Sequence, residues 1–191
     1  MTYFALVPAW ELNVTNWNDV DQVHQAIMAL FPKDLPGDAR TKRSESNILF
    51  RVDEAANGKH LLISTDIPVE YPTPGTRKRD FTPPDLAAGS PVHFRTTVNV
   101  IKRNGSRAIP SDDIAGWLEA RLGEALGEIQ PILHSRTIGR LHHGGAASAL
   151  QMDTVGGIAT VLNPHKLNEI LRSGVGRAKA YGCGLLSIAG Q

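Results

Sequence analysis

Cysteine is nearly absent from this chain, which has one, Cys183, among its 191 residues. A single thiol cannot form an internal disulfide or a zinc site built from several cysteines. Disulfide-stapled scaffolds and zinc ribbons are therefore excluded. The sequence also has no G-x-S-x-G elbow and no cysteine beside a suitable histidine, so nothing specific points to nucleophilic acyl chemistry.

Long apolar runs are missing as well. No stretch approaches the roughly 18 apolar residues that a membrane-spanning helix needs. The N-terminal segment MTYFALVPAWELN lacks the basic start and the long apolar centre of a signal peptide. We therefore expect a soluble, cytoplasmic protein with no membrane partner.

Net charge is small, at +1. A polyanion would have to bind a local basic patch, because the field of the whole molecule is nearly neutral. Cations do cluster, while acidic residues gather near 112–128, so the charge is segregated in a way that suits one basic face against a phosphate backbone. Each cluster taken alone is more often simply a solvated surface. The clusters are Arg40, Lys42 and Arg43; Arg77, Lys78 and Arg79; Lys102, Arg103 and Arg107; and Arg136 and Arg140.

The composition that remains is globular, with 41% hydrophobic and 20% charged residues. Hydrophobic periodicity predicts, in each half, a strand, a helix, two strands and a later strand, with a short or missing second helix. Residues 71–91 are rich in proline and glycine and are predicted to be a connecting loop. We expect an α+β fold of two tandem ferredoxin-like (RRM-like) domains with antiparallel sheets, at 1–90 and 91–191. Helices are expected at 19–31, after a Ser111 cap, and at 164–173. Strands are expected at 2–8, 47–52, 60–67 and 92–105, near 128–135, 147–153 and 157–162, and at 184–189.

A glycine-rich segment, GVGRAKAYGCG, places Gly174 and Gly176 beside Arg177 and Lys179. Backbone amides without side chains can approach phosphate oxygens closely, and the two cations would neutralise them. The pattern is neither a Walker loop nor a dinucleotide-binding fingerprint. An equally good interpretation is a tight turn from helix to strand.

His24 lies on the first predicted helix, at the edge of the apolar stripe that includes Val23 and Ile27. A boundary histidine can reach a groove, where its imidazole is suited to proton transfer at neutral pH. The alternative is a purely structural histidine. The seven histidines show no spacing typical of metal ligands, so we expect neither a metal site nor a cofactor.

Three stretches together resemble the CasE group of CRISPR-associated endoribonucleases, which cut precursor CRISPR RNA at its repeat hairpin. DVDQVHQAIMALFP is similar to that family's histidine-bearing helix, GKHLLISTDIPV to its second hairpin strand, and LRSGVGRAKAYGCGLLSIA to its C-terminal glycine-rich signature. VHFRTTVNVIKR and IAGWLEARLGEA add support, so the resemblance spans nearly the whole chain.

The resemblance implies tandem ferredoxin-like domains, an RNA hairpin bound across them, metal-independent cleavage and retention of the product with other Cascade subunits. It places the family's catalytic histidine at His24 and its glycine loop at Gly174 to Gly184. Some relatives carry a tyrosine three residues before that histidine, whereas this chain has Asp21. Either the tyrosine is dispensable or another residue replaces it, and the candidate replacements are Tyr3, Arg40 and Lys42.

The sequence therefore leads to a mechanistic hypothesis in which the 2′-hydroxyl upstream of the cut attacks the adjacent phosphorus, leaving a 2′,3′-cyclic phosphate. His24 would move protons. The alternative is a non-catalytic subunit that binds the RNA hairpin with the same fold. The expected RNA-binding residues are Arg40, Lys42, Arg43, Lys102, Arg103, Gly174, Gly176, Arg177 and Lys179.

Overall fold

The computed structural model describes residues 2–37, 42–70, 73–104, 107–143 and 146–190, and it forms two compact units. The first unit comprises Met1–Thr82, Gly139–Ala149 and Lys179–Gly182. The second comprises Pro83–Ile138, Leu150–Ala178 and Cys183–Gln191. Two segments from the second half of the chain thus belong to the first unit.

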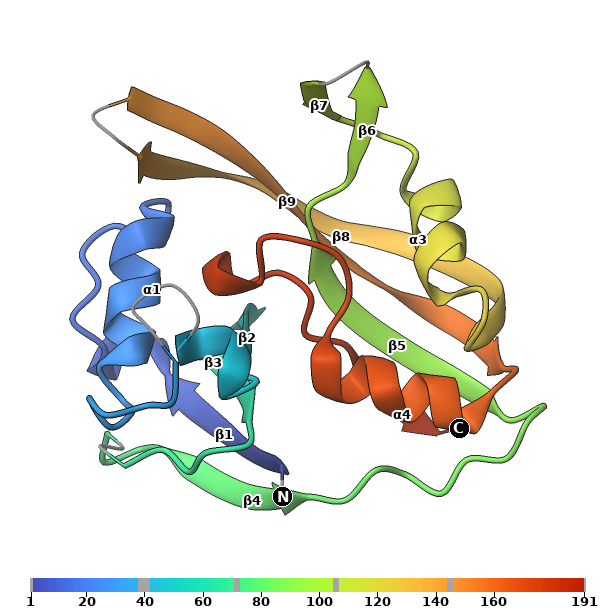
Figure 1. Cartoon of the computed structure of the whole chain (residues 1–191), viewed down its shortest axis with the longest axis horizontal. Helices are drawn as coiled ribbons and strands as arrows, with labels where there is room; N and C mark the ends of the chain where they lie inside the picture. The colour runs from blue at the N-terminus through green and yellow to red at the C-terminus, as the bar shows by residue number, and fades with distance from the viewer. Residues whose placement is uncertain (1, 38–41, 71–72, 105–106, 144–145, 191) are drawn as a thin grey trace. The chain divides into compact units, whose positions relative to one another are not determined.

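The first unit is built on a four-stranded sheet in the order β2-β3-β1-β4 (Figure 1). β1 pairs antiparallel with β3 and β4, and β2 pairs antiparallel with β3. The helix α1 packs its Val23 and Ile27 into a core shared with the sheet residues Val7, Phe50 and Ile63. The elements are β1 (Thr2–Pro8), η1 (Ala9–Glu11), α1 (Val20–Met28), α2 (Lys42–Glu45), β2 (Leu49–Ala55), β3 (Gly58–Thr65), β4 (Arg77–Phe81) and η2 (Lys179–Tyr181).

The prediction of a connecting loop over 71–91 was wrong for Arg77–Phe81, which is the edge strand β4. Arg77, Lys78, Arg79 and Asp80 are exposed, so the strand lacks the alternating apolar pattern by which a strand is recognised. Pairing with β1 defines it instead, together with an edge contact between Phe81 and Phe4 at a centroid distance of 4.6 Å.

The second unit repeats the same plan, with a sheet in the order β10-β5-β9-β8. Asn163 caps α4 through its side chain and Pro164 opens the helix, because proline there sacrifices no helical hydrogen bond. The predicted Ser111 cap was wrong: the Asp113 carboxylate accepts from the Gly116 amide at 2.9 Å and begins α3. The elements are β5 (Pro91–Val98), β6 (Ile101–Asn104), β7 (Arg107–Pro110), α3 (Ile114–Leu122), β8 (Leu126–His143), β9 (Ala146–Val161), α4 (Pro164–Ser173) and β10 (Ser187–Gly190).

The neighbouring strands β8 and β9 are the longest in the chain (Figure 1). The separate strands expected at 147–153 and 157–162 are in fact one continuous strand, β9. A Cβ added at Gly157 would lie 2.1 Å from the Gln130 carbonyl oxygen of β8, so glycine there allows a close approach of the two backbones. With two four-stranded antiparallel sheets, each carrying a β-α-β-β order, the predicted fold class is confirmed.

Candidate active site

His24 lies on α1, a helix that begins where the Asp19 side chain accepts from the Gln22 amide at 3.1 Å. Its helical neighbours Val23 and Ile27 are buried, while His24 itself is only half-buried at the edge of the apolar face. Within the described part of the chain, its Nδ1 atom is buried and has no hydrogen-bond partner. A half-buried imidazole whose Nδ1 atom is enclosed is thus present in the first unit.

Burial is the main influence on His24 and lowers the pKa of its imidazole below the usual 6.5. A hydrogen bond with the backbone of Ala180 opposes this, the positive charge of Arg43 lowers the pKa further, and the carboxylate of Asp21 raises it. At neutral pH the ring is therefore mainly uncharged, which is the form able to accept a proton.

Two cations accompany the histidine. Lys179 comes from η2 and is half-buried, and Arg43 comes from α2, where its Nη1 donates to the Ile48 carbonyl oxygen at 2.7 Å. Burial lowers the pKa of both side chains, and the charge of Arg43 lowers that of Lys179 as well. Because like charges are kept close here, the surroundings of His24 favour an anion.

Tyr181 is the site residue that the sequence analysis missed. It follows Lys179 in η2, and its ring meets the His24 ring edge-on, with centroids 6.3 Å apart and an interplanar angle of 67°. Burial, and then the nearby Asp21 carboxylate, raise the pKa of its phenol. The available signal was an aromatic residue inside the glycine-rich segment, but the sequence alone does not show which side chain it faces.

Asp21 has a structural contact of its own. Its Oδ2 accepts from the His142 amide at 2.7 Å, and the Arg140 amide donates to the Asn18 carbonyl oxygen at 2.6 Å. The end of β8 is thereby fastened to the start of α1. Asp21 thus anchors the end of this strand.

Two glycines of the C-terminal segment adopt backbone conformations with positive φ. Gly174 ends α4 with φ of 75° and donates its amide to the Ile170 carbonyl oxygen. Gly176 has φ of 71°, and a Cβ there would lie 2.7 Å from the Trp117 ring. Both lie in the second unit, as does the exposed Arg177, whereas Lys179 belongs to the first.

The other predicted residues are spread over both units. Arg40 lies outside the described residues, Lys42 opens α2, and Tyr3 lies on β1. Lys102 and Arg103 lie on β6 in the second unit, with Lys102 exposed. The structure therefore gathers three predicted residues at one place: His24, Arg43 and Lys179.

Arg136, which belonged to one of the basic clusters, is held by carboxylates. Its Nε donates to the fully buried Asp153 at 2.6 Å and its Nη1 to Asp112 at 2.5 Å, and both bonds raise its pKa. Since its charge is already neutralised, Arg136 serves the fold of the second unit.

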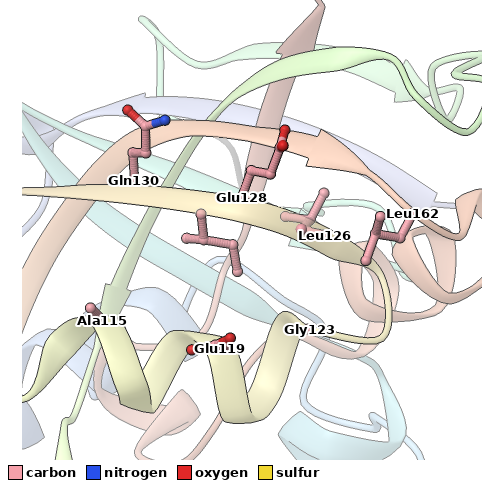
Figure 2. A pocket seen from close by; sticks show the side chains of 9 residues that line it. Ala115, Glu119, Gly123, Leu126, Glu128, Gln130 and Leu162 are labelled. Carbon is pink, nitrogen blue, oxygen red and sulfur yellow. The ribbon is translucent and has the colours of Figure 1, made fainter.

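A pocket of about 420 Å³ opens between α3 and β8 in the second unit (Figure 2). Its described lining contains the carboxylates of Glu119 and Glu128 and none of the predicted site residues. Negative charge there disfavours binding of a phosphate group. Over the described residues, no three histidine, cysteine or acidic side chains are grouped as metal ligands would be. None of the helices described is both long enough and apolar enough to cross a membrane.

Comparison with known proteins gives consistent matches over the whole chain. The sequence model of a family described as CRISPR associated protein matches residues 4–190. The CRISPR system Cascade subunit CasE of Escherichia coli (strain K12) is 29% identical over 192 residues, covering 90% of this chain and 92% of that protein.

Solved structures match the fold. The crystal structure of Cas6e from Escherichia coli K-12 has a TM-score of 0.68 and 24% identity, covering 99% of both chains. Thermus thermophilus Cse3, bound to an RNA representing a pre-cleavage complex, has a TM-score of 0.74 and 22% identity, covering 98% of both chains.

Proposed function

This chain belongs to the CRISPR-associated protein family, and on that premise we propose that it is an endoribonuclease that cleaves precursor CRISPR RNA at the repeat hairpin. The observation that carries the proposal is the half-buried His24 imidazole, accompanied by Arg43 and Lys179. A proton carrier beside two cations is one arrangement that can cleave a phosphodiester.

The proposed reaction is an intramolecular transesterification. The 2′-oxygen upstream of the cut loses its proton and bonds to phosphorus, while the bond from phosphorus to the 5′-oxygen breaks. That oxygen gains a proton, so the products are a 2′,3′-cyclic phosphate and a 5′-hydroxyl. Because the RNA supplies its own nucleophile and side chains supply proton transfer and positive charge, the scheme needs no metal ion.

In this scheme His24 moves one of the protons, and Lys179 and Arg43 stabilise the extra negative charge that builds up on the phosphate. The remaining cations, Arg40, Lys42, Lys102, Arg103 and Arg177, contact phosphates along the hairpin stem. Gly174 and Gly176 support this by shaping the segment that carries Arg177 and Lys179. Stem recognition through phosphates and shape follows because A-form RNA hides most base edges.

The product is expected to remain bound and to join other Cascade subunits, as the name of the E. coli relative implies for that protein. The alternative function is a non-catalytic subunit that binds the same hairpin. It would bind as tightly and leave the RNA intact.

The deciding experiment is single-turnover cleavage of the host's own repeat RNA with identification of the new termini. We expect His24→Ala to lose about 10² to 10⁴-fold in rate while hairpin affinity is retained. The matched control is His165→Ala, because that imidazole is 91% exposed on α4. Normal cleavage by the His24 variant would contradict the proposal, and intact RNA with the unchanged protein would favour the binding subunit.

Two further experiments test the proposed reaction mechanism. A 2′-deoxy substitution at the cut should abolish cleavage, and continued cutting would identify water as the nucleophile. Excess chelator should leave the rate unchanged, and complete loss of activity would show that a metal ion is required.

We expect the two cations of the C-terminal segment to have different roles. Arg177→Ala is expected to weaken RNA binding alone, whereas Lys179→Ala should also slow cleavage at saturating protein. Equal effects of both variants on the cleavage step would remove Lys179 from the catalytic group.

A further inference from the structure

The residue that orients the His24 imidazole is not obvious from α1, because its buried Nδ1 has no hydrogen-bond partner among the described residues. A catalytic histidine is usually held by a hydrogen bond to its second nitrogen. Without that bond, the orientation of the ring depends on its remaining contacts.

The contact that the structure provides comes from η2. The backbone of Ala180 forms a hydrogen bond with His24, and the adjacent Tyr181 ring lies edge-on to the imidazole with centroids 6.3 Å apart. That separation and the 67° interplanar angle fall within the range of attractive edge-to-face pairs.

η2 is itself fixed in place. Gly182, which follows it, has φ of 92°, and a Cβ added there would lie 3.0 Å from the ring of Phe50 on β2. Phe50 is buried in the core of the first unit, so the backbone beside Tyr181 rests on a rigid surface. A ring carried by such a segment can restrain its neighbour.

We propose that Tyr181 is a positioning residue for the proposed cleavage reaction: its ring, packed against His24, holds the imidazole in the orientation needed for proton transfer. This inference rests on the proposed function. We assign the positioning to the ring because the contact with His24 is made ring to ring. Burial and Asp21 raise the pKa of the phenol, so its hydroxyl stays protonated.

The charged groups around the pair come from three elements. Asp21 lies on α1, Arg43 on α2 and Lys179 on η2. Asp21 raises the pKa of His24 and Arg43 lowers it, while burial is the largest influence. Removing the Tyr181 ring reduces the burial, so the pKa of His24 must then rise toward 6.5.

The test compares Tyr181→Phe, which keeps the ring, with Tyr181→Leu, which removes it. Cleavage is measured in single turnover at saturating protein, and RNA affinity is measured separately. We expect the Phe variant to keep its rate and the Leu variant to lose about 2- to 12-fold with unchanged affinity. Equal losses in both variants would assign the work to the hydroxyl and overturn the proposal.

A second measurement uses the RNA-free protein and does not depend on activity. NMR titration of the His24 ring should give a higher pKa in the Leu variant and an unchanged pKa in the Phe variant. Cross-relaxation between the two rings should be visible in the unchanged protein, and its absence would overturn the inference even if the Leu variant fails to fold. If His24→Ala cleaves normally, the proposed function fails, while this titration still decides whether Tyr181 holds the ring.

Discussion

Replacing Gly176 with alanine tests whether this glycine shapes the fold or contacts phosphate. The substitution meets two obstacles in the structure. Its φ of 71° is unfavourable for a residue with a Cβ, at roughly 1–2 kcal/mol. The new methyl carbon would also lie 2.7 Å from the Trp117 ring, and overpacking of this kind costs about 1–3 kcal/mol. Together these give a loss of about 2–5 kcal/mol in the free energy of unfolding.

The Trp117 ring cannot easily move aside. It is 7% exposed, and the Arg121 guanidinium lies over it, 4.4 Å from the ring centroid. The clash is therefore relieved only by a smaller side chain. Trp117→Phe removes the outer ring atoms that the alanine methyl would meet. The double variant should therefore lose less free energy of unfolding than the two single variants lose in sum, by about 1–3 kcal/mol.

The assay is urea unfolding of the four proteins followed by far-ultraviolet circular dichroism, with RNA affinity measured alongside. Additive losses would refute the packing argument. A Gly176→Ala protein that keeps its stability but loses affinity would show instead that a phosphate approaches this glycine. The double variant separates the two interpretations, since it restores packing and leaves the added methyl in place.

Three further predictions follow from contacts in the structure. Asp21→Ala and Asp21→Asn should both lower the pKa of His24, since each removes the carboxylate that raises it. Only Asn keeps an acceptor for the His142 amide, so the Ala variant should also be less stable. NMR titration measures the pKa and thermal unfolding measures the stability, and a His24 pKa that stays constant in both variants would contradict the predicted charge effect. Because burial lowers the folded pKa of His24 below its ordinary 6.5, the unfolded chain binds more protons, so stability should fall as pH drops through 6.5 toward the folded pKa. His24→Gln should reduce that dependence in urea unfolding at about pH 5.5 and about pH 7.5, and a dependence equal to that of the unchanged protein would exclude His24 as its source. Arg136→Ala should lower the unfolding midpoint far more than Arg140→Ala, because it leaves the fully buried Asp153 without its cation; equal midpoints would show that Asp153 is satisfied without Arg136.

The helices were largely predictable from the sequence. In α1 and α4 the apolar residues recur at helical spacing, and a capping side chain stands directly before each, Asp19 and Asn163 respectively. Such signals lie within one segment of the sequence, so they predict a helix without knowledge of the surface against which it packs. The α3 cap shows the limit: Ser111 and Asp113 are both good caps, and only the backbone geometry selected Asp113.

The edge strand β4 could not be predicted in this way. A strand exposed at the sheet edge needs no apolar alternation. The run of cations Arg77, Lys78 and Arg79 therefore has the pattern of a loop. What makes it a strand is a row of hydrogen bonds to β1, a partner that is distant in the sequence.

By itself, the sequence determined the two-part α+β plan, the family and the placement of His24 at the edge of an apolar helix face. These follow from periodicity and from motifs that lie within single segments. Only the tertiary structure decided that Lys179 and Tyr181 join His24, that Asp21 anchors β8, and that Arg136 is bound by carboxylates. Each of these is a contact between residues far apart in the chain, and the folding of the backbone alone decides which of them meet.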